Sequence, residues 1–588
     1  MAQRPLLIEM APAPELADAA SSALWAGPEA AEAVAAAAAL PPLPGVQLDT
    51  SYPPTQLPGR QAAERSDDPT DTALEMFALT LEPEQSTYLV RAFVEEDEAE
   101  ATAERLRERE DVVGVYADPE VKPTIVCPGS AAVGTDADVE RLLCTAALHA
   151  AGADGTGVLV AIVDTGLNVA YLNSRGKTPV FDSTRSWSVA AGTVPGAVPV
   201  NHGTMCAYDV CIAAPKCTLI DVALLRPFTA TPSGFAAFLS DAVRAYRHLV
   251  EIMLEEKRPG GFRSLVVNNS WGMFDPAWDF PPGDAGNYSD NPNHPFNLIV
   301  GDLARAGADI LFAAGNCGPD CPDGRCGGHT SNAIYGANGH GSVLCVAGVD
   351  VTKTRVGYST VGPGRLTHNK PDISSYTHFR GSGVYPADGG TSAATPVAAG
   401  VVAAVRSRLP YDPATPSTHP AAIRTLLTTT AEDLGSAGYD FRHGFGVIDG
   451  CALERRLRPT ITRPPISICD RYPWLCRPIP IDLCRRYPWL CRPFPVPPRV
   501  PVPPFPPGPL PPPVPPVPPG PQPPFSGLEQ GPAFAGGEQG LGGEAQALAE
   551  LQSDPVALSY ALGYYDGQQS AEPRAEGQSR PEGCGCGD

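Results

Sequence analysis

The sequence predicts an α/β protein with a doubly wound, mainly parallel sheet, preceded by a small α+β domain and followed by a Pro-rich disordered arm. Three observations lead to this prediction. Short apolar runs alternate with helical patterns across residues 130–456. A β, α, β alternation occupies residues 72–124. Most of the excess among the 68 prolines lies after residue 457.

The N-terminal part divides into two segments. Residues 1–71 are rich in alanine, proline and acidic residues without sustained periodicity, so we expect them to be disordered or weakly helical. Within residues 72–124, TALEMFALTL is typical of a strand, and the stretch beginning PEQSTYLVRAFVEE holds a second strand and then a charged helix. DVVGVYADPEVKP holds a further strand that leads into a turn. This order indicates a small α+β domain.

The central region contains the apolar runs that define the predicted sheet. Strands buried on both faces of a parallel sheet are almost continuously apolar, and these runs have that character. Helical patterns separate them, as a doubly wound sheet requires, and such sheets bind ligands at the carboxyl ends of their strands. The runs are VLVAIVDTG, KCTLIDVALL, SLVVNNSWG, ADILFAAGN and SVLCVAGVD.

The C-terminal part is an arm and a tail. Residues 457–524 are Pro-rich and carry two copies of YPWLC, a composition typical of extended spacers or recognition ligands. Residues 525–588 are rich in Gly, Glu and Gln and end in CGCGD. Each YPWLC repeat lies within a C-x₆-C pair, for which disulfide-closed loops and a reduced linker are both open alternatives. The pairs are Cys469 with Cys476 and Cys484 with Cys491.

Composition narrows the partners and the compartment. A net charge of −23 argues against a nucleic-acid binder, which needs a basic face. No apolar run reaches the roughly 18 residues of a membrane helix, so we expect no membrane span. The first residues do not form a convincing signal peptide, which favours a cytoplasmic over a secreted protein. The 16 cysteines would suit disulfides in an exported protein, so localisation stays open.

Three residues of the central region, 130–456, have the side chains and the positions at element ends that nucleophilic catalysis needs. Asp164 ends the run AIVDTG, His202 starts a helical stretch in NHGTMCAYDV, and Ser392 lies where the Gly-rich turn GGTS enters a helix. A serine hydroxyl needs an adjacent base, and imidazole has a suitable pKa. The base in turn needs a carboxylate to orient it. We therefore predict Asp164, His202 and Ser392 as a catalytic triad.

Two further segments suit the same chemistry. Asn316 follows the strand in FAAGN, and its side-chain amide would donate a hydrogen bond to the oxyanion of a tetrahedral intermediate. Ser270, Trp271 and Gly272 follow the strand in VNNSWG, where exposed backbone would pair with an extended peptide as an added β-strand.

These motifs, in this order, resemble the subtilisin-like serine protease family (subtilases, peptidase S8). DTG, HGT and GTSAATP resemble its three catalytic signatures, AAGN its oxyanion segment and NNSWG its substrate-binding strand, and the resemblance covers about residues 130–452. It implies a serine endopeptidase that acts on proteins or peptides through an acyl-enzyme. Ala314 and Gly315 would then join Ser270, Trp271 and Gly272 in binding substrate.

The same resemblance carries expectations for the flanks and for cofactors. Residues 72–124 resemble the inhibitory propeptide of that family, which implies a zymogen whose own N-terminal domain is an intramolecular inhibitor. Catalysis requires no cofactor, and no metal ligand is predicted. Structural calcium is common in the family, but no loop here shows a set of carboxylates that would assign it.

Several residues depart from the family pattern. Met205 and Cys206 replace the common His-Val, and KPDI runs into SSYTHF, so we expect a different loop there. Trp271 is bulkier than the usual leucine. The insertion CGPDCPDGRCGG follows Asn316, and together with Trp271 it predicts a shaped pocket beside the scissile bond. Its three cysteines suit either a disulfide or a metal site.

An alternative function belongs to another class. A protease-like but inactive scaffold would use the Pro-rich arm and its YPWLC repeats to hold partners by polyproline docking. The intact triad and Asn316 argue against this as the only role.

Overall fold

We describe the fold from a computed structural model. The described residues all belong to one compact unit, which spans the N-terminal and central parts of the chain. The Pro-rich arm, both YPWLC repeats and the CGCGD tail lie outside them, so the predictions for those segments stay predictions. The described ranges are 3–26, 31–60, 79–124, 130–227, 235–255 and 264–458.

The N-terminal domain is built around an antiparallel sheet of order β2-β6-β1-β7, with β3 also paired to β6. Strand β6 (Thr87–Glu95), helix α4 (Ala99–Arg107) and strand β7 (Val112–Ala117) follow the predicted order of strand, charged helix and strand. The remaining elements are β2 (Gln47–Leu48), β3 (Thr55–Leu57), β4 (Gly59–Arg60), β5 (Leu79–Thr80), α1 (Pro14–Ala26) and α2 (Ala31–Ala38). Most of TALEMFALTL lies outside the described residues.

The prediction of a disordered segment over residues 1–71 is wrong in its first part. Gln3–Met10 forms β1, the inner strand that pairs with β6 on one side and β7 on the other. Leu6, Leu7 and Ile8 are fully buried there. A single short apolar run shows no periodicity by itself, and here its stability comes from pairing with strands about 80 to 110 residues further along the chain.

The central domain confirms the predicted doubly wound α/β fold. Its sheet has the order β10-β12-β9-β15-β17-β18-β19, and every neighbouring pair is parallel. All five predicted runs form strands. The bounds are β9 (Val158–Asp164), β10 (Val180–Phe181), β11 (Trp187–Ser188), β12 (Thr218–Ala223), β15 (Ser264–Asn269), β17 (Asp309–Ala313), β18 (Leu344–Val349) and β19 (Ile373–Tyr376). The segment SSY after KPDI continues as β19 at the edge of this sheet.

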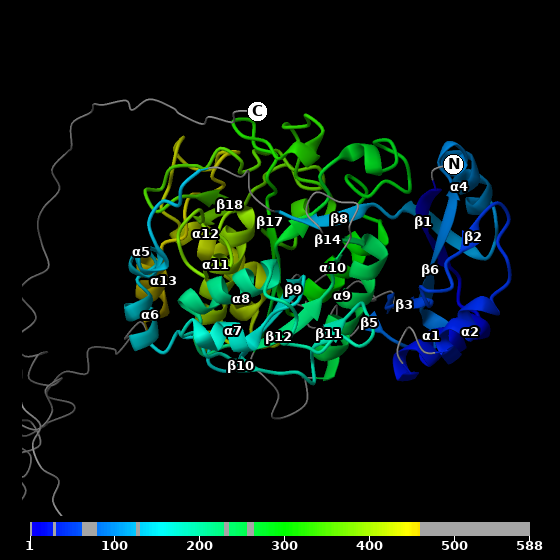
Figure 1. Ribbon diagram of the computed structural model, residues 1–588, viewed down its shortest axis with the longest axis horizontal. Coiled ribbons are helices and arrows are strands. Elements are labelled where there is room, and N and C mark those ends of the chain that lie inside the picture. Colours follow the sequence, from blue (N-terminus) through cyan, green and yellow to red (C-terminus); the bar gives the residue numbers. More distant parts are fainter. Residues whose placement is uncertain are drawn as a thin grey trace, which may run out of the picture. The chain divides into compact units, whose positions relative to one another are not determined.

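Helices cover both faces of the sheet, as Figure 1 shows. Along β9, Val158, Val160 and Ile162 pack with helices α8 (His202–Ala213) and α11 (Thr391–Arg408). The alternate residues Leu159, Ala161 and Val163 pack with α9 (Leu239–Glu255) and α10 (Pro295–Arg305) on the opposite face. This two-sided burial explains why the strand is apolar throughout. The other helices are α5 (Asp136–Leu142), α6 (Thr145–Ala150), α7 (Val169–Ser174), α12 (Pro420–Thr430) and α13 (Gly450–Leu457).

A second, antiparallel sheet joins the N-terminal domain to the central one. Its order is β13-β14-β8-β16, formed by Arg226–Pro227, Phe235–Phe238, Glu120–Pro123 and Trp271–Gly272. Strand β8 is the last strand of the N-terminal part, and in Figure 1 its blue ribbon lies beside the green β14. The N-terminal part therefore inserts a strand between two elements of the central domain.

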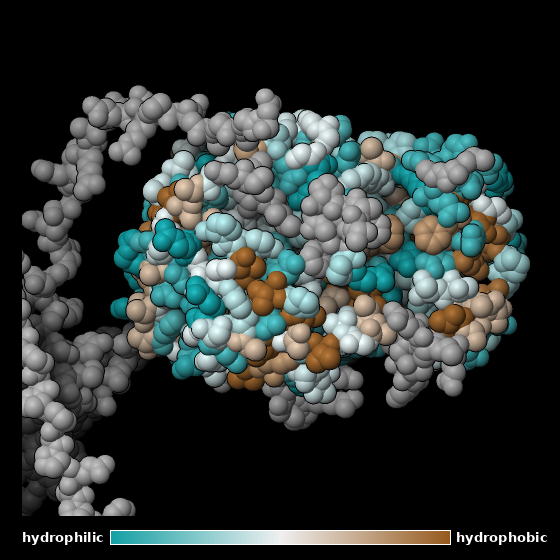
Figure 2. Space-filling model, viewed as in Figure 1, coloured by the Kyte–Doolittle hydropathy of each residue, from teal (hydrophilic) through white to brown (hydrophobic). Residues whose placement is uncertain are grey.

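The surface is mixed in polarity. Figure 2 shows apolar side chains in small groups separated by polar ones on the face in view. Among the helices of the described ranges, none is both long and apolar enough to cross a membrane.

A buried ion pair ties α11 to the sheet and gives a stability prediction. The Arg406 guanidinium is fully buried and donates to both carboxylate oxygens of Asp309 at the start of β17, with one of these distances 2.8 Å. Replacing Arg406 with Met leaves the Asp309 carboxylate buried and unpaired, which costs about 3–5 kcal/mol. We expect a clear fall in the unfolding midpoint in guanidinium chloride, measured by circular dichroism. Arg408→Met, at an exposed position of the same helix turn, is the control and should change little.

Candidate active site

Asp164 and His202 meet at the carboxyl edge of the parallel sheet. Asp164 is the last residue of β9, and His202 is the first residue of α8, whose start is capped by the side chain of Asn201. His202 Nδ1 lies 2.8 and 3.0 Å from the two carboxylate oxygens of Asp164. Both side chains are buried. The carboxylate also accepts a hydrogen bond from the backbone N–H of Thr165 at 2.7 Å, so it is held in place to orient the imidazole.

Ser392 lies in the first turn of α11, directly after Gly390 and Thr391. Gly390 has a φ of +72°, a backbone conformation that favours glycine. The thiol of Cys206 shows how close the three residues are, because its sulfur lies 3.8 Å from Asp164 Oδ2, 3.9 Å from His202 Nδ1 and 3.7 Å from the carbonyl oxygen of Ser392. The packing of α8 against α11 thus gathers residues 164, 202 and 392 in one small volume.

Asn316 faces the same point from the loop after β17. Its Oδ1 accepts hydrogen bonds from the backbone N–H of Thr391 at 2.9 Å and from the Thr391 hydroxyl at 3.0 Å. These bonds turn the amide so that Nδ2 points away from Thr391. Nδ2 donates to the backbone carbonyl oxygen of Thr124 at 2.9 Å.

The residue that completes the site comes from the end of the N-terminal part. Thr124 follows β8, and its backbone N–H donates to the carbonyl oxygen of Ser270 at 3.2 Å, which extends the pairing of β8 with β16. Its own carbonyl oxygen accepts from the Ser392 hydroxyl at 2.7 Å as well as from Asn316. A Cβ on Gly390 would lie 2.4 Å from this oxygen, so the close approach requires glycine there. Chain segment 120–124 therefore lies as an extended peptide along the strand edge, with one carbonyl at the predicted nucleophile.

Comparison with known proteins assigns the central region to a family. The model of the subtilase family matches residues 155–446. This part of the chain belongs to the subtilase family. Subtilisin NAT of Bacillus subtilis subsp. natto is 26% identical over 313 residues, which cover 52% of this chain and 67% of that protein. Subtilisin of Bacillus pumilus is also 26% identical, over 52% of this chain and 93% of its own. A solved structure titled S41 Psychrophilic Protease aligns with a TM-score of 0.37 and 20% identity, over 50% of this chain and 92% of that one.

The family match supports a serine peptidase. Among the predicted site residues, Ser270, Asn316 and Ser392 contact Thr124 directly. Ser270, Trp271 and Gly272 meet β8 through their backbones. Ala314 and Gly315 lie between β17 and Asn316. Gly315 donates to the Thr391 hydroxyl and accepts from the Thr360 backbone N–H, so it supports the loop.

The prediction that the Trp271 side chain shapes a pocket is wrong. Its indole is fully buried, donates to the carbonyl oxygen of Val163 at 3.0 Å, and packs against Phe296 and Phe312. Side chains of a strand point to its two faces in alternation, while the backbone pairs along the edge. Trp271 can therefore pair with β8 through its backbone and place its indole in the core. The position near the site thus says nothing of where the side chain points.

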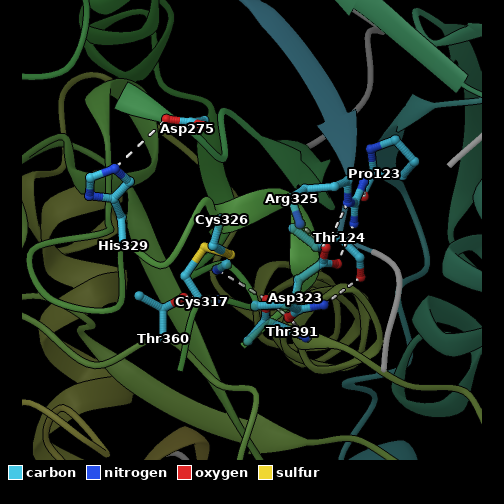
Figure 3. Close-up of a disulfide and its surroundings, with 12 residues drawn as sticks. Pro123, Thr124, Asp275, Cys317, Asp323, Arg325, Cys326, His329, Thr360 and Thr391 are labelled. Atoms are coloured by element: carbon cyan, nitrogen blue, oxygen red, sulfur yellow. Dashed lines mark hydrogen bonds and ion pairs between the residues drawn. A yellow bond between two sulfur atoms is a disulfide. The ribbon is translucent and has the colours of Figure 1, made fainter. Parts of the chain in front are cut away.

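The cysteine insertion forms a disulfide-closed loop. Cys317 and Cys326 form a disulfide, which decides between the two alternatives for this pair, while Cys321 is buried. Figure 3 shows this disulfide beside Arg325, whose side chain reaches toward Pro123. Sequence reasoning missed Thr124 and Arg325. The available signals were that VKPT immediately precedes the catalytic region and that Arg325 is the one basic residue of CGPDCPDGRCGG.

One group among the described residues has side chains close enough to hold a metal ion, and it is the site itself. Ligand atoms of Asp164, His202 and Cys206 lie within 4.8 Å of one another. Burial and the nearby Asp164 charge raise the pKa of the Cys206 thiol well above its usual value. A neutral thiol is a poor ligand, and Asp164 is already engaged with His202, so this arrangement fits a hydrogen-bonded pair better than a metal centre.

Proposed function

We propose that this subtilase is a serine endopeptidase made as a zymogen, with Asp164, His202 and Ser392 as its triad and Asn316 as its oxyanion donor. The observation that carries the proposal is the Thr124 carbonyl, which lies between the Ser392 hydroxyl and the Asn316 amide. The chain enters this point from β8 and continues beyond it. A peptide bond inside a chain is therefore in the position of substrate, which favours an endopeptidase.

The proposed reaction follows from these contacts. Ser392 Oγ attacks the carbonyl carbon of the bound peptide while His202 Nε2 takes its proton, and Asp164 stabilises the imidazolium. The carbonyl electron pair moves onto the oxygen, where Asn316 donates to it. His202 then gives the proton to the leaving amine, and water hydrolyses the acyl-enzyme by the same steps.

In the proposed mechanism, this geometry precedes attack by the serine. The Ser392 hydroxyl donates to the Thr124 carbonyl oxygen, and His202 Nε2 is buried with no hydrogen-bond partner among the described residues. That nitrogen is therefore available to accept the serine proton once the hydroxyl turns toward it. Catalytic hydrogen bonds are often formed only in the reacting complex.

The N-terminal domain is proposed as the inhibitor because its contacts continue beyond β8. Ser240 at the start of α9 donates to both carboxylate oxygens of Asp118, at 2.8 and 2.7 Å. Arg91 of β6 lies 3.5 Å from the Asp241 carboxylate and donates to the Ser240 hydroxyl. In the proposal, these contacts hold β8 between β14 and β16, so that no other peptide can pair with β16. Cleavage of the bond after Thr124 would separate the domain from the peptidase.

Replacement of the nucleophile tests the proposal directly. We expect Ser392→Ala to abolish peptide hydrolysis and self-cleavage, and we expect the wild-type chain to yield a new N-terminus at Ile125, read by N-terminal sequencing. Labelling of active-site serine by a fluorophosphonate should vanish in Ser392→Ala and persist in Ser183→Ala, an exposed serine. A wild-type chain that neither cleaves nor labels after removal of residues 1–124 would point to the inactive scaffold instead.

Asn316→Ala tests the oxyanion role. Loss of one donor to a developing oxyanion typically lowers kcat by about 10²–10³-fold, while KM changes little because the bond is strongest in the transition state. Steady-state kinetics on a peptide p-nitroanilide would measure both constants. Asn173→Ala, at an exposed position in α7, serves as the control and should leave both unchanged. A rise in KM that accounts for the whole fall in kcat/KM, with kcat unchanged, would contradict the assignment.

The Asp118 contact predicts a pH dependence of inhibition. Burial raises the pKa of Asp118 to about 6 from an ordinary 3.8, against the opposing charge of Arg91. The docked carboxyl therefore binds a proton that the free one releases, so its contribution to docking is full below about pH 4 and is lost as pH rises through about 6.

Asp118→Asn isolates this effect from other groups at the interface, such as His294, whose pKa burial lowers to about 4. The dissociation constant of the cleaved N-terminal segment should rise, relative to that of Asp118→Asn, by about a hundredfold between pH 4 and pH 7. Residual peptidase activity on serial dilution gives both constants. If the ratio of the wild-type dissociation constant to that of Asp118→Asn does not change between pH 4 and pH 7, Asp118 does not change protonation on docking.

A further inference from the structure

The disulfide-closed loop between Asn316 and Gly327 contacts the bound segment one residue before Thr124. Arg325 Nη1 donates to the backbone carbonyl oxygen of Pro123 at 2.8 Å. We infer that Arg325 is a substrate-binding residue, which donates to the main-chain carbonyl of the residue preceding the one that is cleaved. This inference rests on the proposed function, because it assigns the Thr124 carbonyl to the position of attack.

Arg325 donates to a main-chain carbonyl oxygen, so any extended peptide bound in the same way could accept this hydrogen bond. Pro123 pairs with Trp271 in the β8–β16 ladder, whose antiparallel geometry fixes where its carbonyl points. A charged donor to a carbonyl is stronger than a neutral one. The class of ligand is therefore an extended peptide backbone, recognised independently of the side chain at this position.

The guanidinium is also held by groups that do not belong to the bound segment. Arg325 Nε and Nη2 donate to the two carboxylate oxygens of Asp323, at 2.9 and 2.7 Å. Its guanidinium carbon lies 3.9 Å from the centre of the Phe274 ring, and the side chain is only 8% exposed. A guanidinium that is already bonded to a carboxylate and stacked on an aromatic ring loses little conformational entropy when a peptide binds. Arg325 thus presents Nη1 to the Pro123 carbonyl in a fixed direction.

The loop couples this donor to the oxyanion donor. The backbone N–H of Asp323 donates to the carbonyl oxygen of Asn316 at 2.9 Å, and Cys317, the next residue, is bonded to Cys326, the neighbour of Arg325. Figure 3 shows the disulfide, Asp323 and Arg325 on one loop, with Pro123 and Thr124 facing it. Asn316 and Arg325 therefore bind adjacent carbonyls of the same peptide from the two ends of a loop that the disulfide closes.

A single-atom change in substrate tests the contact. We would compare a peptide ending Val-Lys-Pro-Thr-p-nitroanilide with the same peptide carrying a thioamide in place of the Pro–Thr amide, since sulfur is a poor acceptor but the N–H and planarity remain. The self-processed wild-type enzyme should show a kcat/KM at least severalfold lower for the thioamide, mainly through KM. Equal rates for the two substrates would overturn the inference, and this arm requires no variant.

Arg325→Met removes the donor and keeps a long apolar side chain over Phe274. We expect its kcat/KM for the normal peptide to fall about tenfold to hundredfold, the size of one charge-assisted hydrogen bond. The difference between amide and thioamide should disappear, because the variant has no donor to lose. Arg455→Met, an exposed change on α13, should retain the wild-type rates and the wild-type difference.

Asp323→Asn tests the positioning residue. It should lower the rate less than Arg325→Met does and should reduce, without abolishing, the discrimination between the two substrates. A variant that loses rate but keeps full discrimination would assign Asp323 a purely structural role and contradict the coupling. Absence of Ser392-dependent hydrolysis in wild type would refute the proposed function itself, whereas normal hydrolysis by Arg325→Met would refute only the inference.

Discussion

Strands β9, β15 and β17 lie side by side and parallel, so their carboxyl ends emerge at one edge of the sheet. Asp164 ends the first strand, Ser270 follows the second, and Asn316 follows the third after a short loop. Helices α8 and α11 begin at the same edge and bring His202 and Ser392. The site depends on this constraint, because the parallel strands and the helices beside them bring Ser270, Asn316 and Ser392 within hydrogen-bonding distance of one peptide.

The edge is polar within an apolar domain, and its polar groups are satisfied largely by one another. Asp164 engages His202, Thr391 orients the Asn316 amide, and the Ser270 hydroxyl donates to the carbonyl oxygen of Ser392 at 3.0 Å. Such a buried network is rigid because each lost bond would leave an unsatisfied group. In the proposed mechanism this rigidity holds the donors where charge develops, so little reorganisation accompanies the reaction.

Inhibition and catalysis would use the same contacts. Thr124 lies at the strand edge and bonds both the Asn316 amide and the Ser392 hydroxyl. In the proposal, the contacts of Asp118 and Arg91 with Ser240 add affinity away from the catalytic residues. A segment held in this way is both the first proposed substrate and a barrier to later ones. The contact of Arg325 with Pro123 extends the same logic by one residue, since any bound peptide presents a carbonyl there.

The parallel α/β class, the strands and the four residues Asp164, His202, Ser392 and Asn316 could all be predicted from the sequence. The strands follow from almost continuously apolar runs, and the four residues follow from short motifs at strand ends, for Asp164 and Asn316, and at helix starts, for His202 and Ser392. The three-dimensional structure was needed to establish that Gln3–Met10 is an inner strand, that the Trp271 indole enters the core, and that Thr124 and Arg325 reach the site. Each of these depends on pairing or burial between distant segments, and no local pattern of residues encodes which segments will meet.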